Sequence, residues 1–118
     1  MADNFYLDND DLRFQIETMT DWNSINSMRE DFSSEECPFE NVEEAREANI
    51  DMLTDPVGSL AAERIAPRAE EIDREGCKLE NGQVIFPDGV NRNMADLKDA
   101  QLSGITMGTE YGGMGFSK

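Results

Sequence analysis

Histidine is absent from this sequence of 118 residues. Because histidine is the usual proton carrier of enzymes and a frequent metal ligand, its absence excludes Ser-His-Asp and Cys-His nucleophile systems and ordinary His-ligated metal sites. Cysteine is scarce, since Cys37 and Cys77 are the only two and lack a Cys-x-x-Cys spacing. Two unrelated thiols are typical of a reduced protein, so we expect a cytoplasmic location.

Positive charge is also scarce. Ten lysine and arginine residues stand against 26 aspartate and glutamate residues, for a net charge of -16. Nucleic acids and anionic membranes are bound by clustered cations, so we expect neither as a partner, and we expect no nucleotide phosphate to be held here. A solvated acidic surface that maintains solubility is the simplest interpretation, and a basic protein partner is the alternative.

Long apolar runs are missing as well. No segment approaches the length of a transmembrane helix, so we expect no membrane insertion. The first four residues lack the basic region and apolar stretch of a signal peptide. Hydrophobic residues make up 38% and the mean hydropathy is -0.62, which is lean for an independent core. The length corresponds to one small domain or a part of one.

Two local patterns resemble ligand sites but do not meet their requirements. Counted from Asp8, the acidic stretch at residues 8–11 has Arg13 where a calcium loop needs glycine and Met19 where it needs glutamate. These residues suit a helix start instead, with Asn9 or Asp10 as the cap. The Gly113-x-Gly115 pattern has no strand before it and no helix after it, so it is not a dinucleotide fingerprint. We therefore expect no metal-binding residue and no dinucleotide-binding motif in this chain.

Apolar residues at helical spacing dominate the chain. They predict a helix from about Asp10 to Thr20 and a short helical turn that Asp21 caps and Trp22 anchors. The charged, serine-rich residues 29–40 read as a connector. Near Asn41, a residue suited to capping a helix, a longer stripe begins that continues past Pro56 and Pro67. The stripe comprises Val42, Ala45, Met52, Leu53, Leu60, Ala61, Ile65, Ala69 and Ile72.

Proline interrupts helical hydrogen bonding, so the stripe predicts either two or three coaxial segments or one long helix bent near Pro56 or Pro67. Gly76 stands where a left-handed C-cap belongs. In residues 78–89, the turn pairs Asn-Gly and Asp-Gly flank a short β-like run and predict a small hairpin or an extended loop. A last helix is expected from Asn91 to Ser103, ended by Gly104. The fold class is therefore all-α, with a small hairpin or loop.

Four sequence features follow one another in an order that resembles the N-terminal helical domain of acyl-CoA dehydrogenases. The helix ending Ala66-Pro67-Arg68-Ala69-Glu70-Glu71-Ile72-Asp73-Arg74-Glu75-Gly76 comes first, and Phe86-Pro87-Asp88-Gly89 follows it. Then come Leu102-Ser103-Gly104-Ile105 and the turn Glu110-Tyr111-Gly112-Gly113-Met114-Gly115. Residues 4–14 resemble the extra N-terminal segment of the longer bacterial branch. The interpretation divides the chain into an extension with short helices, 1–40, and a partial N-terminal helical domain, 41–118.

This resemblance implies a truncated flavoenzyme that, when intact, oxidises acyl-CoA to 2-enoyl-CoA. It implies FAD as cofactor, a catalytic glutamate that takes the α-proton, and an electron-transfer flavoprotein as partner. It also implies that the glutamate and much of the flavin site lie downstream, so no catalytic or cofactor-binding residue is expected in this chain. The chain alone is therefore expected to bind no FAD and to be inactive. What carries over is the turn of Tyr111, Gly112, Gly113 and Gly115, which in the family lies toward the acyl side of the pocket. A purely structural turn is the alternative.

A non-enzymatic acidic helical adaptor that binds a basic partner is the competing function, although it gives the glycine-rich turn no role. We also expect self-association, because apolar residues that would cover downstream domains seek another partner. Charge repulsion opposes such pairing, so salt is expected to strengthen it. The expected contacts are Met52, Leu53, Leu60, Ile65 and Leu97.

Overall fold

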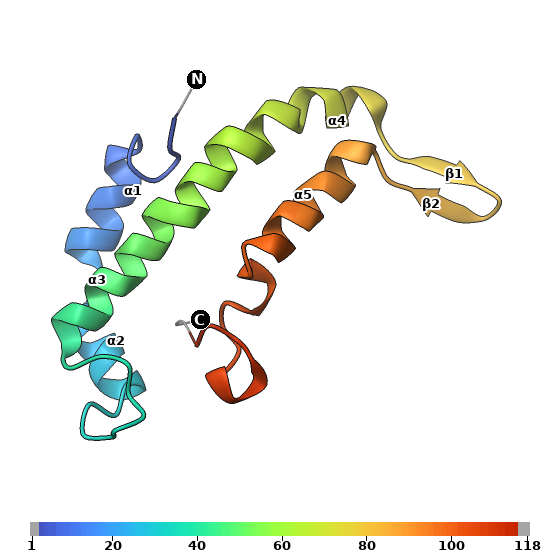
Figure 1. Ribbon diagram of the computed structural model, residues 1–118. Helices are drawn as coiled ribbons and strands as arrows, with labels where there is room; N and C mark the ends of the chain where they lie inside the picture. Colours follow the sequence, from blue (N-terminus) through green and yellow to red (C-terminus); the bar gives the residue numbers. More distant parts are fainter. Residues whose placement is uncertain (1–2, 116–118) are drawn as a thin grey trace.

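A long helical rod organises the chain. The computed structural model describes residues 3–115 and is mostly helical, with one two-stranded antiparallel hairpin. In Figure 1 the rod runs from α3 to α4, with α1 and α2 on one side, α5 on the other, and the hairpin projecting beyond α4. The elements are α1 (Asp10–Phe14), α2 (Trp22–Arg29), α3 (Val42–Met52), α4 (Ala69–Glu75), β1 (Lys78–Glu80), β2 (Gln83–Ile85) and α5 (Asp88–Asp99).

The helix starts in the first half follow the capping residues of the sequence. Asn9 accepts a hydrogen bond from the backbone N–H of Leu12, and α1 continues through a π-helical turn to Met19, which confirms the first predicted helix. Asp21 caps α2 by accepting from the N–H of Ser24, and α2 is a full helix rather than a short turn. Asn41 caps α3 in the same way. In each case a side-chain oxygen satisfies an N–H that the first helical turn leaves without a partner.

The rod is one helical path with a kink at the first of its two prolines. Residues 42–75 are helical throughout, except that Asp55 has φ -144° and ψ 125°. Proline disfavours the α conformation of the residue before it, which accounts for the extended backbone ahead of Pro56. Pro67 lies in a short 3₁₀ turn, Ala66–Arg68. The predicted long helix with an interruption at Pro56 is confirmed.

The N-terminal residues 3–9 fill the kink. The side chain of Asn4 donates to the carbonyl oxygen of Thr54 at 2.8 Å and to Oγ of Ser59 at 3.1 Å. Its Oδ1 accepts from the backbone N–H groups of Tyr6 and Leu7, and the N–H of Phe5 donates to the carbonyl of Gly58. A break in a helix exposes backbone groups that need partners. The side-chain amide of Asn4 is the partner of the Thr54 carbonyl.

The second half contains the hairpin and α5. Strand β1 pairs with β2, with Leu79 opposite Val84, and Asn81 and Gly82 form the connection with positive φ at both positions. Of the two predicted alternatives, the small hairpin is therefore the one observed. Gly76 ends α4 with φ 64° and ψ 172°, so φ is positive as predicted but ψ is not that of the left-handed helix.

The predicted bounds of the last helix were wrong. Helix α5 begins at Asp88 and ends at Asp99, and Gln101 rather than Gly104 has the left-handed conformation after it. Asp88 and Gly89 do not form a turn, because Pro87 precedes the helix and both residues enter its first turn. A Cβ on Gly89 would lie 2.5 Å from Cγ1 of Ile72, so glycine here allows the close approach of α5 to α4.

Helix α5 is also joined to the rod by an ion pair. Nη1 of Arg68 lies 2.6 Å from Oδ2 of Asp96 and donates to Oδ1 of Asn93 at 2.9 Å. Both partners of the ion pair are mostly buried, so solvent and salt screen this pair less than they screen an exposed pair. This contact holds α5 against the rod.

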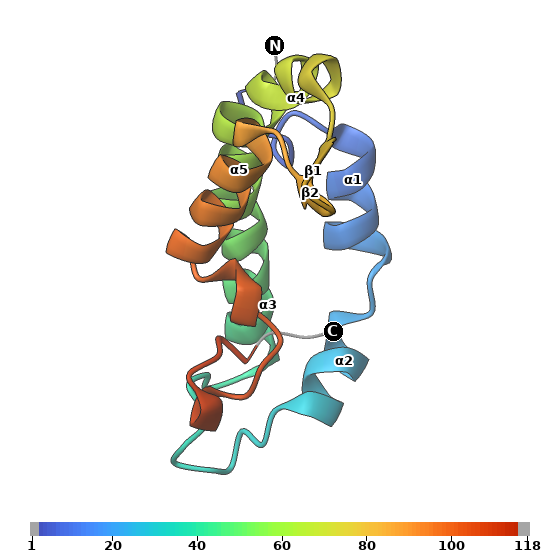
Figure 2. The ribbon, with the colours of Figure 1, turned by 90° about the vertical axis from the view of Figure 1, so that its right-hand side faces the viewer.

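The molecule is elongated and has a thin core. Its extents are 56 × 34 × 18 Å and its radius of gyration is 17.8 Å, whereas a compact chain of this length has about 13 Å. Figure 2 shows α5 and α1 on opposite sides of the view, with the rod beside α5. Within residues 3–115, the buried apolar side chains are Tyr6, Ala45 and Ala62. None of the described helices combines the length and the hydropathy needed to cross a membrane.

Tyr6 joins the N-terminal segment to the first helix. Its side chain is buried at 3% exposure, and its hydroxyl donates to Oε1 of Glu17 at 2.9 Å. Arg13 donates to the same carboxylate, and Arg46 of α3 donates to the backbone carbonyl of Glu17. Burial, and then the bond to Glu17, raise the pKa of Tyr6 from 10.0 to about 12.

This raised pKa predicts a loss of stability in alkali. The folded chain holds the phenolic proton of Tyr6 more tightly than the unfolded chain. The contribution of protonated Tyr6 to the free energy of unfolding is therefore complete below pH 10.0 and is lost as pH rises through about 12. Urea unfolding followed by Trp22 fluorescence across this range measures it. Tyr6→Phe should remove this loss, whereas Tyr111→Phe should retain it. An equal alkaline loss in Tyr6→Phe and the parent chain would assign it to other groups.

Candidate functional site

The glycine-rich turn after α5 is held by backbone hydrogen bonds. Gly113 N–H donates to the carbonyl of Gly108 at 3.1 Å, Met114 N–H to that of Gly104 at 3.1 Å, and Gly115 N–H to that of Met107 at 2.8 Å. A short 3₁₀ turn, Thr109–Tyr111, forms the outer part of the loop. The described part of the turn is therefore folded on itself.

The glycines of this turn have different reasons to be glycine. Gly112 has φ 78° and Gly115 has φ 69°, which is the region that side-chain-bearing residues avoid. Gly113 is limited by space, because a Cβ there would lie 2.2 Å from the carbonyl oxygen of Met107. Gly108 has φ -60° and ψ 147°, which are values that proline also adopts.

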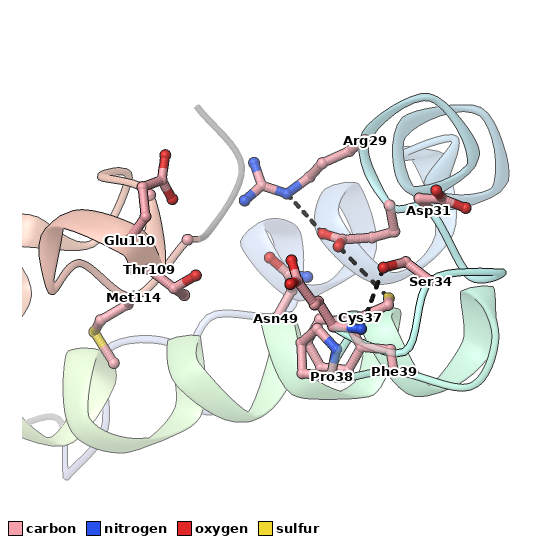
Figure 3. A pocket seen from close by; sticks show the side chains of 14 residues that line it. Arg29, Asp31, Ser34, Cys37, Pro38, Phe39, Asn49, Thr109, Glu110 and Met114 are labelled. Atoms are coloured by element: carbon pink, nitrogen blue, oxygen red, sulfur yellow. Dashed lines mark hydrogen bonds and ion pairs between the residues drawn. The ribbon is translucent and has the colours of Figure 1, made fainter.

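A cavity of about 310 Å³ lies between this turn and the connector after α2. Figure 3 shows Arg29, Ser34, Cys37 and Phe39 on one side, and Thr109, Glu110 and Met114 on the other. Helix α3 contributes Asn49. The complete lining is Arg29, Glu30, Asp31, Ser34, Glu36, Cys37, Pro38, Phe39, Asn49, Gly108, Thr109, Glu110, Met114 and Gly115.

The cavity has an acidic rim and an apolar part. Nε of Arg29, the cation among its lining residues, lies 2.8 Å from Oε1 of Glu30. The Ser33 hydroxyl and then its N–H hold the pKa of Asp31 below its usual value, so this carboxylate is charged at neutral pH. Pro38, Phe39 and Met114 supply apolar surface. The combination favours a small uncharged group over an anion.

The predicted site residues are only partly brought to this cavity. Gly115 lines it, whereas Gly112 and Gly113 shape the turn behind it and Tyr111 is 76% exposed outside it. Arg29, Phe39 and the other connector residues were not among the predicted site residues, because the composition of residues 29–40 indicates only a link. No local pattern marks them, since about 70 residues of chain separate the connector from the turn.

The lining of this cavity does not match a flavin site. The acidic rim would repel the pyrophosphate of a dinucleotide, and no glycine-rich loop leads into a helix here to bind it. Within residues 3–115, no three acidic or cysteine side chains are grouped so that they could hold a metal ion. The cavity is thus suited to a small organic group.

Comparison with known proteins identifies the family. The model of the acyl-CoA dehydrogenase N-terminal domain matches residues 47–118. This chain therefore belongs to the acyl-CoA dehydrogenase family.

A curated relative from Ruegeria pomeroyi, named 3-methylmercaptopropionyl-CoA dehydrogenase, is 30% identical over 108 residues. The aligned part is 92% of this chain but 16% of the relative's length. No solved structure matches the chain significantly.

Proposed function

We propose that this chain is the N-terminal helical part of a flavin-dependent acyl-CoA dehydrogenase that converts an acyl-CoA to the 2-enoyl-CoA. The observation that carries the proposal is the family match over residues 47–118, which contains the whole glycine-rich turn. The name of the Ruegeria pomeroyi relative supports a CoA thioester as substrate. Because this chain spans 16% of that relative, the reacting groups are proposed to lie in the rest of the protein.

In this proposal the chain supplies one wall of the substrate pocket and no reacting group. The turn of Tyr111, Gly112, Gly113 and Gly115 faces the acyl side of the bound thioester. Gly115 supports this orientation because it borders the cavity. The exposed Tyr111 ring supports a contact with the remainder of the protein or with substrate, because a large exposed aromatic side chain is typical of a recognition surface. FAD, an electron-transfer flavoprotein partner, self-association and a cytoplasmic location belong to the same proposal.

The test compares the complete protein encoded by this reading frame with the present chain alone. The complete protein should carry flavin in about equimolar amount, lose its yellow colour when an acyl-CoA is added, and reduce an artificial electron acceptor. The present chain alone should be colourless and inactive, because cofactor sites draw their binding energy from several elements. Absorbance spectra and a dye-reduction assay measure both.

The outcomes separate the candidate functions. A complete protein without flavin and without acyl-CoA oxidation would contradict the dehydrogenase and favour the acidic adaptor. Stoichiometric flavin on the present chain alone would contradict only the location of the cofactor site.

A further inference from the structure

We propose that the connector, residues 29–40, closes the acyl end of the substrate pocket and restricts the enzyme to short, uncharged acyl groups. Phe39 and Met114 set the limit of chain length, and the acidic rim rejects carboxylate-bearing chains. The inference rests on the proposed function, because it assigns a substrate class to the cavity that the turn borders. Its new content is a specificity role for a segment that precedes the region matched by the family model.

Local hydrogen bonds order the connector, which forms one wall of the cavity. Ser33 donates its N–H and its hydroxyl to Oδ1 of Asp31, and Ser34 N–H donates to the Asp31 carbonyl. The N–H of Cys37 donates to the carbonyl of Ser34, and the N–H of Glu36 donates to the Ser34 hydroxyl. Consecutive bonds of this kind hold the backbone in one path, so the side chains that follow have defined positions.

The wall is also fixed against the rod. Asn26 of α2 is fully buried and donates to the carbonyl of Val42 at 3.3 Å, beside the buried Ala45 of α3. The connector leaves α2 three residues later and returns into α3 at Val42, so both of its ends are attached to the same packed helix pair. A cavity wall that is anchored at both ends can exclude a longer ligand instead of moving aside.

The size of the cavity limits what it can hold. Its volume of about 310 Å³ corresponds to about ten water molecules, at the low end of the range for ligand pockets. A CoA thioester is far larger, so only the end of its acyl chain enters. Phe39 and Met114 lie on opposite walls in Figure 3, which makes their side chains the groups that an elongating chain meets.

Charge limits the chemistry further. Glu30, Asp31, Glu36 and Glu110 line the cavity, and the guanidinium of Arg29 is already paired with Glu30. A carboxylate at the end of an acyl chain would face several like charges and one cation that is already paired. Such juxtaposition disfavours binding strongly. An uncharged chain meets no such penalty and gains contact with the apolar part.

The experiment uses the complete protein and a series of acyl-CoA thioesters: butanoyl, hexanoyl, octanoyl and decanoyl. The parent protein should prefer the short members, and Phe39→Ala and Met114→Ala should each raise kcat/KM for a longer chain relative to butanoyl-CoA by about tenfold or more. Calorimetric binding of the matching 2-enoyl-CoA products should shift in the same direction. Succinyl-CoA should be at least about a hundredfold poorer than butanoyl-CoA in the parent protein.

Met28→Ala is the matched control, because Met28 precedes Arg29 on α2, is 82% exposed and does not line the cavity. It should leave the chain-length profile unchanged. Flavin content and melting temperature establish that each variant is folded. An unchanged profile in both folded cavity variants, with an active parent, overturns this inference and leaves the proposed function standing. A parent protein that oxidises no acyl-CoA overturns the proposed function, and this inference with it.

Discussion

Gly113→Ala in the complete protein is expected to lower acyl-CoA oxidation by more than about a hundredfold, because a displacement of about 1 Å near a reacting substrate can have that effect. The added Cβ would lie 2.2 Å from the carbonyl oxygen of Met107 and 2.6 Å from its carbonyl carbon. These are backbone atoms, so no side-chain rotation relieves the clash. The turn must open, and its bonds to Gly104, Met107 and Gly108 are lost together.

Hydrogen exchange of the Met114 and Gly115 amides measures the opening directly, because both donate within the turn. Their protection should be lost in Gly113→Ala. Gly112→Ala is the matched comparison, since its Cβ meets nothing within 4 Å and only the positive φ is strained. That strain costs about 1–2 kcal/mol, so protection and activity should fall much less. Equal effects of the two substitutions would contradict the steric argument.

Asn4→Ala is expected to destabilise the present chain by about 3 kcal/mol. Asn4 is 8% exposed, and its side chain donates to Thr54 and Ser59 and accepts from Tyr6 and Leu7. The substitution leaves these groups without their partner at the kink, and each buried polar group left unsatisfied costs about 1–3 kcal/mol. Urea unfolding followed by circular dichroism measures the change in the free energy of unfolding.

Two further variants test this account of the kink. Gly58→Ala should destabilise the chain by about 1–3 kcal/mol, because its Cβ would lie 2.2 Å from Oδ1 of Asn4 and displace the same segment. Both variants disrupt the same contact between Asn4 and Gly58. The double variant should therefore lose less unfolding free energy than the sum of the two single losses. Asn91→Ala, on the exposed face of α5, is the control and should change stability by less than about 0.5 kcal/mol. Additive effects at Asn4 and Gly58 would show that the segment is held by other contacts.

The sequence by itself determined the helix starts of the first half and the family. Asn9, Asp21 and Asn41 cap helices where they were expected, because capping depends on a side chain and an N–H three residues away. The residue before Pro56 leaves the helix because of a clash between sequence neighbours. The ordered motifs that resemble acyl-CoA dehydrogenases lie in the region that the family model matches. All of these features depend on short-range geometry or on order along the chain.

Only the tertiary structure decided the start of α5, the closure of the kink and the wall of the cavity. Gly89 lies in the first turn of α5 and allows the close approach of α5 to Ile72, although the pair Asp88-Gly89 alone is typical of a turn. Asn4 reaches Thr54, and Phe39 lines the same cavity as Met114, across long intervals of sequence. Asn4 meets Thr54 because the N-terminal segment lies against the kink of the rod. Met114 meets the connector because the chain reverses direction between α4 and α5 (Figure 1). No local preference of the residues involved specifies either path.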